Sequence, residues 1–249
     1  MKTKINVIIP MAGIGARFKN QGFKDPKPFI QIDGKSLIEI VLENLELNSY
    51  EAEFFLVAQS SHLKSYKNIS NRIINSYEAN FIEINEMTRG SLDSISKAEL
   101  FVSEDSPLII ANSDQFVELK MDDFISDAFT RNLDGSILVF EEKEKDPKWS
   151  FVKVNEKSLV TEVAEKQVIS SYASVGVYYF KSTLDFFKNM RIMLGRGETI
   201  NGEFYTCPIY NVFIEQNRNI GIYLIDNHKM HGLGTPEDLD KFILKKIAK

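Results

Sequence analysis

The sequence predicts an α/β fold in which helices flank a mostly parallel sheet and a small antiparallel β layer is added later in the chain. Two observations predict it. In the first half, continuous apolar runs such as Ile5–Pro10 alternate with segments of helical periodicity, and strands without polar alternation are typical of parallel sheets covered on both faces. After Glu141 the runs become short and alternate with polar residues, which indicates antiparallel strands.

The elements of the first half follow from local patterns. Ser36–Leu47 is predicted to be a helix, because its apolar residues recur at helical spacing and Ser36 with Glu39 has capping-box spacing. The expected strands of this half are Ile5–Pro10, Phe54–Ala58, Phe81–Asn85, Leu108–Ala111 and Ile137–Glu141, and the other expected helices are Ser91–Phe101 and Asp122–Arg131.

The second half begins with a charged connection that contains a proline, EEKEKDPKW. The expected strands are Phe151–Val154, Leu159–Val163, Ser174–Phe180 and Ile220–Ile225, and the expected helices are Ser182–Leu194, Tyr205–Gln216 and one opened by TPEDL. No linker is long enough to separate independent domains, so residues 1–249 are expected to form one domain.

Charge and composition exclude several classes of function. The net charge is −5 and the cations are scattered, so we expect no nucleic-acid partner. Cys207 is the only cysteine, which excludes an intramolecular disulfide and a cysteine-built zinc site. Neither a signal-peptide h-region nor a run of membrane-spanning length is present, so we expect a cytoplasmic protein without a membrane partner. A homo-oligomer is compatible with the sequence, which does not determine one.

The loop after the first strand, MAGIGARF, is a candidate phosphate site. Gly13 and Gly15 let backbone N–H groups approach an anion, Arg17 offers a planar fork of donors, and Lys27 is a point charge between two prolines. A G-x-G alone is most often only a turn. The third glycine of the dinucleotide fingerprint and the G-K-[ST] of a Walker loop are both missing. The combination favours a site for a triphosphate.

MAGIGARF…DPKPFIQIDGKSLIEIVLENL resembles the signature of nucleotidylyltransferases that join an NTP to a phosphorylated acceptor, often a sugar 1-phosphate. Five separated positions agree, and the resemblance extends over nearly the whole chain. It implies a Rossmann-like sheet of the nucleotide-diphospho-sugar transferase type, with residues 1–141 binding the nucleotide and residues 142–249 the acceptor. It also implies that Arg17 neutralises the β- and γ-phosphates and that Lys27 bridges the α-phosphate and the attacking phosphate. The loop residues implied to lie along the nucleotide are Met11, Ala12, Gly13, Ile14 and Gly15.

In LIIANSDQF, Asp114 directly follows a buried strand, where a carboxylate is suited to hold Mg²⁺. Asn-Ser-Asp at a strand end is more often a helix cap or an Asx turn. The resemblance matches Asp114 to the family's metal-binding aspartate, with Asn112 orienting it or contacting the ribose.

Two further groups of segments carry implied contacts. In EMTRGSLDS, Thr88, Gly90 and Ser91 match the family segment that faces the base and sugar, although an ordinary helix cap at Ser91 explains the same residues. In VTEVAEKQ, SVGVYYF and NGEFYTCPIY, the implied acceptor residues are Glu165, Lys166, Gly176 and Glu203. Each of these signals is weak alone.

MHGLGTPEDL departs from the family pattern. Many sugar-phosphate members carry an aspartate, as a second metal ligand, where this chain has Gly232. A second metal is therefore either absent or completed by the nucleotide, by water or by His231.

Several segments, among them DPKPF, ANSDQF and DPKWSFVKV, resemble a branch of the family associated with capsule gene clusters. That resemblance implies MgCTP and L-glutamine phosphate as substrates. A sugar-1-phosphate nucleotidylyltransferase is the alternative within the class. A metal-dependent glycosyltransferase is disfavoured because no D-x-D surrounds Asp114, and a non-catalytic nucleotide-binding module is disfavoured because both Arg17 and Lys27 are present.

Overall fold

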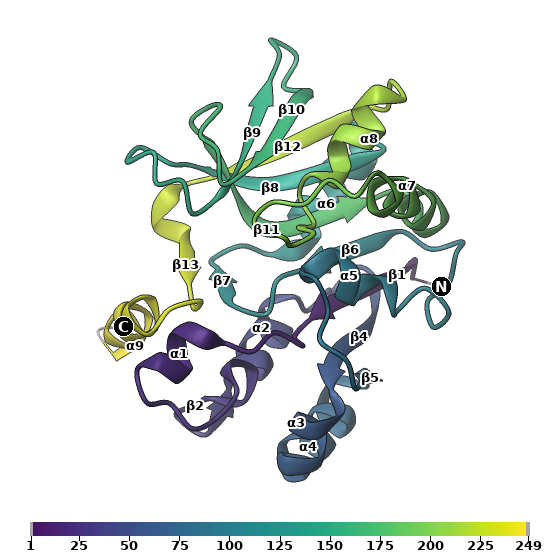
Figure 1. Ribbon diagram of the computed structural model, residues 1–249. Coiled ribbons are helices and arrows are strands. Elements are labelled where there is room, and N and C mark those ends of the chain that lie inside the picture. The colour runs from purple at the N-terminus through teal and green to yellow at the C-terminus, as the bar shows by residue number, and fades with distance from the viewer. Residues whose placement is uncertain (1, 248–249) are drawn as a thin grey trace.

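The computed structural model describes residues 2–247 and contains one large mixed sheet (Figure 1). Its parallel part has the order β5 (Asn80–Ile84), β4 (Glu51–Gln59), β1 (Lys4–Pro10) and β6 (Leu108–Ala111). Strand β11 (Tyr172–Phe180) runs antiparallel to β6 and continues the sheet. It pairs with both β8 (Gly135–Glu141) and β9 (Ser150–Val154), after which β12 (Ile220–Ile225) adds to β8 and β10 (Val160–Glu165) adds to β9. The predicted fold class is confirmed.

Strand β1 is central because it pairs with β4 on one side and β6 on the other. Its alternate residues enter two different cores: Val7 and Ile9 lie in one and Ile8 lies in the other, all fully buried. Burial on both faces explains the continuous apolar run in the sequence.

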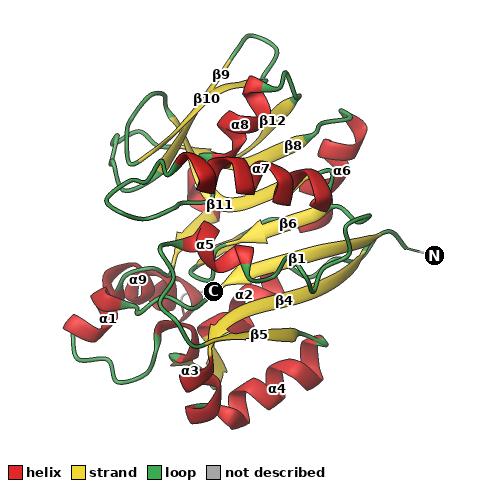
Figure 2. Ribbon diagram, turned by 45° about the vertical axis from the view of Figure 1, so that its right-hand side comes forward, coloured by secondary structure: helices red, strands yellow, loops and turns green. Residues whose placement is uncertain are grey.

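Helices cover both faces of the sheet (Figure 2). One core takes the buried sides of α2 (Leu37–Asn44), α3 (Ser60–Ser65), α4 (Lys67–Tyr77), α6 (Met121–Thr130) and α9 (Pro236–Ile247). The opposite core takes those of α5 (Ser91–Ser96), α7 (Thr183–Arg196) and α8 (Ile209–Glu215). The predicted capping box of α2 is confirmed, since the Ser36 N–H donates to Glu39 Oε2 over 2.8 Å.

Three helices are shorter than predicted, and the first of them, α2, ends at Asn44 instead of Leu47. α5 ends at Ser96 instead of Phe101, because the chain beyond it continues as turns with i to i+3 bonds such as Phe101 N–H to Ala98 O. α8 begins at Ile209 instead of Tyr205. The residues before it are bonded to the loop around Gly90, and Pro208 caps the helix.

Short elements that the sequence analysis did not predict connect the larger ones. They are α1 (Ala16–Asn20), the 3-10 turns η1 (Lys27–Phe29) and η2 (Asn227–Lys229), β2 (Gln31–Ile32) with β3 (Lys35–Ser36), and β7 (Gln115–Val117) with β13 (Met230–Gly232). Near the chain's end, α9 lies beside α1, as Figures 1 and 2 both show, and Gln21 Nε2 donates to Glu237 Oε1 over 2.6 Å. The C-terminal helix therefore packs against the loop that follows the first strand.

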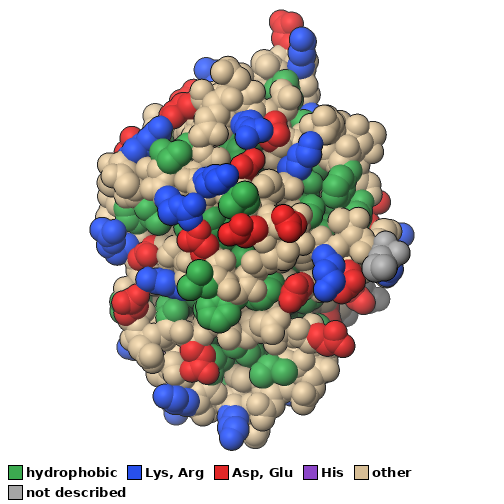
Figure 3. All heavy atoms as spheres, turned by 90° about the vertical axis from the view of Figure 1, so that its right-hand side faces the viewer, with side chains coloured by type: hydrophobic (Ala, Val, Ile, Leu, Met, Phe, Trp, Pro, Cys, Tyr) green, Lys and Arg blue, Asp and Glu red, His purple; other side chains and the backbone are tan. Residues whose placement is uncertain are grey.

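The surface carries charges of both signs. On the face drawn in Figure 3, Lys and Arg side chains alternate with Asp and Glu side chains, and neither sign forms a separate block there. Across residues 2–247, no helix is long and apolar enough to cross a membrane.

Candidate active site

Two adjoining cavities lie where β1 and β6 end. The first has a volume of about 330 Å³ and the second about 250 Å³. Their common wall is made by Ser91, Asn112, Asp114 and Tyr205, which line both cavities. This is the edge of an α/β sheet at which ligands bind, beyond the carboxyl ends of the parallel strands.

The first cavity collects the loop and helix-start residues predicted to lie along the nucleotide, but not Arg17. These are Met11, Ala12, Gly13, Ile14, Gly15, Thr88, Gly90, Ser91 and Asn112. Lys27 and Asp114 line it as well. No bound nucleotide tests these roles, which stay predictions, but residues from four separate segments converge as the resemblance implies.

Two glycines shape the loop of the first cavity. Gly15 has φ +63° and begins α1, and a Cβ there would lie 3.2 Å from Lys27 Cβ. Gly13 has open space where a Cβ would be. The loop thus holds Lys27 close on one side and leaves its backbone accessible on the other.

The opposite wall depends on Gly90, at φ +102°. A Cβ at this position would lie 2.5 Å from Phe204 O, which is closer than Cβ atoms approach their neighbours in folded proteins. The close approach lets the Phe204 N–H donate to Arg89 O over 2.7 Å and Phe204 O accept from the Leu92 N–H over 3.0 Å. These bonds tie the loop before α5 to the segment before α8, so that Tyr205 reaches both cavities.

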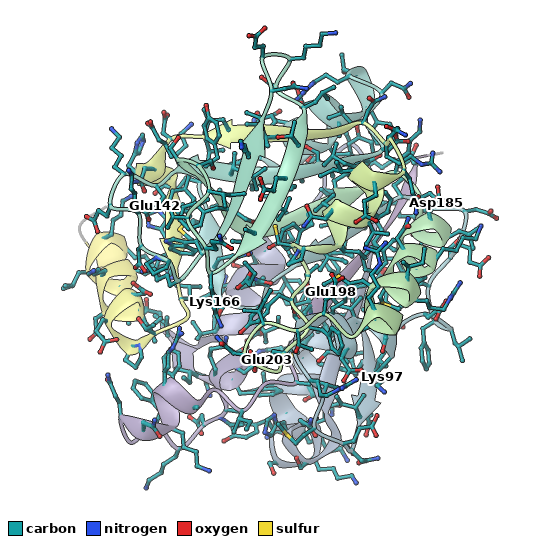
Figure 4. The ribbon with its side chains drawn as sticks, turned by 45° about the horizontal axis from the view of Figure 1, so that its top comes forward. Lys97, Glu142, Lys166, Asp185, Glu198 and Glu203 are labelled. Atoms are coloured by element: carbon teal, nitrogen blue, oxygen red, sulfur yellow. The ribbon has the colours of Figure 1, made fainter. Side chains whose placement is uncertain are left out.

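The second cavity is lined by three of the four predicted acceptor residues, Glu165, Lys166 and Gly176. Glu203 lines the first cavity instead. Lys166 Nζ donates to the Tyr205 hydroxyl, which in turn donates to Glu203 Oε2, and Figure 4 shows Lys166 and Glu203 close together near the centre of the molecule. Glu203 is therefore linked to the lining of the second cavity through Tyr205 and Lys166.

Arg17 also differs from its expected position. The resemblance assigns it to the β- and γ-phosphates, whereas in the structure it lies on α1 and lines the second cavity. Its role stays a prediction. An arginine that lines this cavity offers a planar fork of donors to an anion bound there.

Glu165 has an unusual environment for a carboxylate. Burial raises the pKa of its carboxyl group above the ordinary value, while a hydrogen bond from the Ser150 hydroxyl and the charge of Lys166 act in the opposite direction. Burial also raises the pKa of the Cys207 thiol and of the Tyr178 hydroxyl in the same cavity. Tyr178 and Cys207 are themselves buried, at 3% and 1% exposure, so water has little access to this part of the lining.

Gly176 sits at an irregularity of β11 with φ +89°. A Cβ there would lie 2.4 Å from Asn112 Nδ2 and 2.6 Å from Gln115 Oε1. Gly176 O accepts a 2.9 Å hydrogen bond from the Asn112 N–H, which fixes the two backbones against each other. Glycine at 176 is thus required for the side chains that follow β6 to turn toward the cavities.

At the common wall, Lys27 Nζ lies 2.8 Å from Asp114 Oδ2. Both side chains are mostly buried, with 19% and 28% of their surfaces exposed. The predicted catalytic cation and the predicted metal ligand therefore form one ion pair, at the point where the two cavities meet.

The donor set fits a magnesium ion that arrives with phosphates. Asp114 supplies a carboxylate oxygen, the ligand type that Mg²⁺ prefers, and Mg²⁺ commonly takes one or two carboxylates plus substrate phosphates. Among the residues that the structure describes, no cluster of three or more His, Cys, Asp or Glu side chains is arranged to hold a metal alone. His231 lines neither cavity, because its ring contacts Glu118 Oε1 at 2.9 Å in a separate pocket between β13 and α9.

Several residues of the second cavity were not singled out from the sequence. They are Gln115, Lys148, Trp149, Tyr205 and Asp238. Gln115 directly follows Asp114 and was the most accessible to prediction. The others reach the cavity only through long-range packing, which no local pattern records.

The fold is shared with nucleotidyltransferases of known structure. A nucleoside-diphosphate-sugar pyrophosphorylase from Vibrio cholerae is 23% identical, with a TM-score of 0.78 over 96% of this chain and 99% of that chain. A putative glucose-1-phosphate thymidylyltransferase from Bacillus anthracis is 14% identical, with a TM-score of 0.77 over 97% and 94%. The inositol-1-phosphate CTP transferase from T. maritima is 18% identical, with a TM-score of 0.74 over 100% and 98%. These similarities support the fold.

No match is found among curated proteins. The family described as Nucleotidyl transferase matches residues 6–197, which is more than half of the sequence. The chain therefore belongs to the nucleotidyl transferase family.

Proposed function

We propose that the protein transfers the cytidylyl group of CTP to L-glutamine phosphate, forming CDP-L-glutamine and pyrophosphate. The class of reaction follows from the family, and the substrates are the proposal. The transfer between two phosphates is supported by the pair of cavities that meet at Lys27 and Asp114. Such a transfer needs two adjoining sites with charge compensation between them.

The reaction is an in-line displacement at the α-phosphorus. An oxygen of the acceptor's phosphate forms a bond to the α-phosphorus, and the bond from that phosphorus to the oxygen bridging to the β-phosphate breaks. The electron pair of the broken bond leaves with pyrophosphate. Since the acceptor's phosphate is already ionised near neutral pH, no general base is required. Catalysis then rests on alignment and on stabilisation of negative charge.

The residues have distinct parts in this scheme. Lys27 stabilises the α-phosphate and the incoming phosphate from the common wall, and Lys166 binds the acceptor's phosphate beside Tyr205. Arg17, on the second cavity, adds a further phosphate contact. Asp114 would hold Mg²⁺, which neutralises phosphate charge when bound.

As substrates, CTP and L-glutamine phosphate are supported by the resemblance to the CTP:phosphoglutamine cytidylyltransferase of capsular phosphoramidate biosynthesis. The proposed location of this reaction is the cytoplasm. The structural likeness to the inositol-1-phosphate CTP transferase from T. maritima is consistent with CTP as the donor. The alternative acceptor is a sugar 1-phosphate, favoured by the glucose-1-phosphate thymidylyltransferase and pyrophosphorylase neighbours.

The proposal is tested by incubating the protein with Mg²⁺, a mixture of CTP, UTP, dTTP, ATP and GTP, and a panel containing L-glutamine phosphate, glucose 1-phosphate and inositol 1-phosphate. Mass spectrometry identifies the product, and released pyrophosphate measures the rate. CDP-L-glutamine as the dominant product supports the proposal. A dominant NDP-sugar assigns the protein to the alternative, and bound nucleotide without any turnover rejects catalysis.

Two variants test the roles at the common wall. Lys27→Ala is expected to lose turnover by about 100-fold or more, because one preorganised charge on the transferred group is removed. Asp114→Asn is expected to lose its response to Mg²⁺, measured as a titration of the rate. Turnover that survives Lys27→Ala, or an unchanged Mg²⁺ titration for Asp114→Asn, contradicts the assigned role.

A further inference from the structure

A carboxylate from α9 lies next to Gly232, the position at which the chain departs from its family. A Cβ at residue 232 would lie 3.3 Å from Asp238 Oδ2 and 3.4 Å from Asp238 Cγ. Because glycine has no side chain, the Asp238 carboxylate can lie close to the backbone at residue 232. Both residues line the second cavity.

The carboxylate of Asp238 differs from the other carboxylates of this cavity. Asp114 is paired with Lys27, and Glu165 accepts a hydrogen bond from the Ser150 hydroxyl. In the described part of the chain, no hydrogen bond or ion pair reaches the side-chain oxygens of Asp238. Its backbone N–H donates to Thr235 Oγ1 over 3.1 Å. A half-buried carboxylate that faces a cavity without a partner is suited to a cation.

A second unpaired group lies beside it. Gln115 is the residue directly opposite Gly232 in the β7–β13 ribbon, and opposite residues in an antiparallel pair project from the same face. The residue is 5% exposed, and its Nε2 atom is buried without a hydrogen-bond partner among residues 2–247. Leaving a buried amide nitrogen unpaired is costly, and a rotation about the last torsion lets the amide offer this nitrogen to a ligand in the cavity.

The two groups belong to the cavity proposed for the acceptor. Neither Gln115 nor Asp238 lines the first cavity, whereas Lys166 bonds to Tyr205 at the common wall. An acceptor that occupies the second cavity with its phosphate near Lys166 has its other end within the same lining, which includes Gln115 and Asp238. A hydroxyl group at that end would leave the charge of Asp238 uncompensated, whereas a protonated amine would neutralise it.

We propose that Asp238 and Gln115 recognise the non-phosphate end of the acceptor, with Asp238 receiving a protonated amine and the Gln115 amide donating to an oxygen of the same end group. The acceptor is then a phosphorylated amino compound with an α-amino acid end group. This inference rests on the proposed function of the second cavity as the acceptor site, and it adds two residues that determine specificity.

The test compares L-glutamine phosphate with the same compound acetylated on its α-amino nitrogen, which removes the positive charge and keeps the carboxylate. Wild-type protein is expected to bind the free amine about 10- to 100-fold more tightly, measured by titration calorimetry in the presence of CTP without Mg²⁺. Asp238→Asn keeps the side-chain volume and is expected to abolish this preference. Gln115→Leu is expected to weaken both acceptors equally, because both keep the oxygen.

The matched control is Asp240→Asn, which removes the same charge from the same helix at an exposed position that lines neither cavity. It is expected to keep the preference. In steady-state kinetics, Asp238→Asn is expected to raise the acceptor KM about 10- to 100-fold with little change in kcat or in the KM for CTP, a split that a general loss of folding does not produce.

The outcomes separate this inference from the proposed function. Tight, amine-dependent binding that yields no product with any nucleotide rejects the proposed function and supports the inference. Turnover of both acceptors without preference, or better turnover of glucose 1-phosphate, supports a nucleotidyltransferase and overturns the inference. An Asp238→Asn variant that changes the Mg²⁺ titration equally for both acceptors overturns it too, since the carboxylate then serves a metal.

Discussion

Gly176→Ala is expected to damage both the stability and the acceptor site. The methyl group would stand 2.4 Å from Asn112 Nδ2 and 2.6 Å from Gln115 Oε1, about 1 Å inside a normal contact of about 3.5 Å. The backbone φ of residue 176, +89°, is also one that alanine adopts only under strain. Neither neighbour moves easily, because the Asn112 N–H is bonded to Gly176 O and Gln115 belongs to the β7–β13 ribbon.

The magnitude is the sum of two costs. A strained backbone position costs about 1–3 kcal/mol, and overpacking costs about a further 1–3 kcal/mol. Gly176→Ala is therefore expected to lower the free energy of unfolding by about 2–6 kcal/mol. Displacement of Asn112 and Gln115 is expected to raise the acceptor KM at the same time.

Urea unfolding measures the stability change, with fluorescence of the single tryptophan, Trp149, as the signal. Trp149 lines the second cavity and packs against Phe140 with ring centres 5.3 Å apart, so it reports on the region of the substitution. Gly13→Ala is the control, because nothing lies within 4 Å of its Cβ position. A Gly176→Ala protein within about 0.5 kcal/mol of the wild type, with an unchanged acceptor KM, would refute the reasoning.

Three further changes have expected outcomes. Arg72→Met removes the guanidinium whose Nη2 donates to Glu39 Oε2 over 2.6 Å and is expected to cost about 1.5–3 kcal/mol at neutral pH in urea unfolding. Burial raises the pKa of Glu39, but the bonds from Arg72 and Ser36 and the charge of Arg72 together outweigh it and leave that pKa below its usual value. This contribution is present above the unfolded pKa and is lost as the pH falls through the folded one, so a difference that stays unchanged as the pH is lowered to well below the usual glutamate range contradicts it. Tyr205→Phe removes the hydroxyl that holds Lys166 and is expected to raise the acceptor KM about tenfold in steady-state assays; an unchanged KM contradicts that role. Gly195→Ala, inside α7 with nothing within 4 Å of its Cβ position, is expected to stabilise the protein by about 0.5–1 kcal/mol in thermal unfolding, and a lowered melting temperature contradicts it.

The large elements were predictable because their signals are local. β1 is a continuous apolar run since both of its faces are buried, and α2 begins at a capping box formed by residues three apart. β7 and β13 were missed for the opposite reason. Each has three residues, and each is a strand only because Gln115 and Gly232, from distant parts of the chain, come to lie opposite each other.

In the candidate site, too, the residues with a local signal were predictable and those placed by long-range contacts were not. The glycines of the first loop were predictable from their spacing after a strand, and the structure gathers them around one cavity. The position of Tyr205 was not predictable, because it depends on the close approach of Phe204 to Gly90. The resemblance assigned Glu203 to the acceptor and Arg17 to the nucleotide. In the structure Glu203 lines the first cavity and Arg17 lines the second.

Gly232 illustrates why a substitution in a motif needs its three-dimensional neighbours. In the sequence it marks the loss of an aspartate, and the simplest conclusion is a site with one carboxylate fewer. In the structure the space beside it is occupied by the carboxylate of Asp238, which comes from the next helix and enters the same cavity. The lining of the cavity therefore still contains a carboxylate at this place, but it belongs to α9. The hydrogen bond between Gln21 and Glu237 holds α9 beside the segment after the first strand. Because a carboxylate carried by a different element approaches the acceptor from a different direction, the acceptors that fit are expected to differ from those of members with an aspartate at this position.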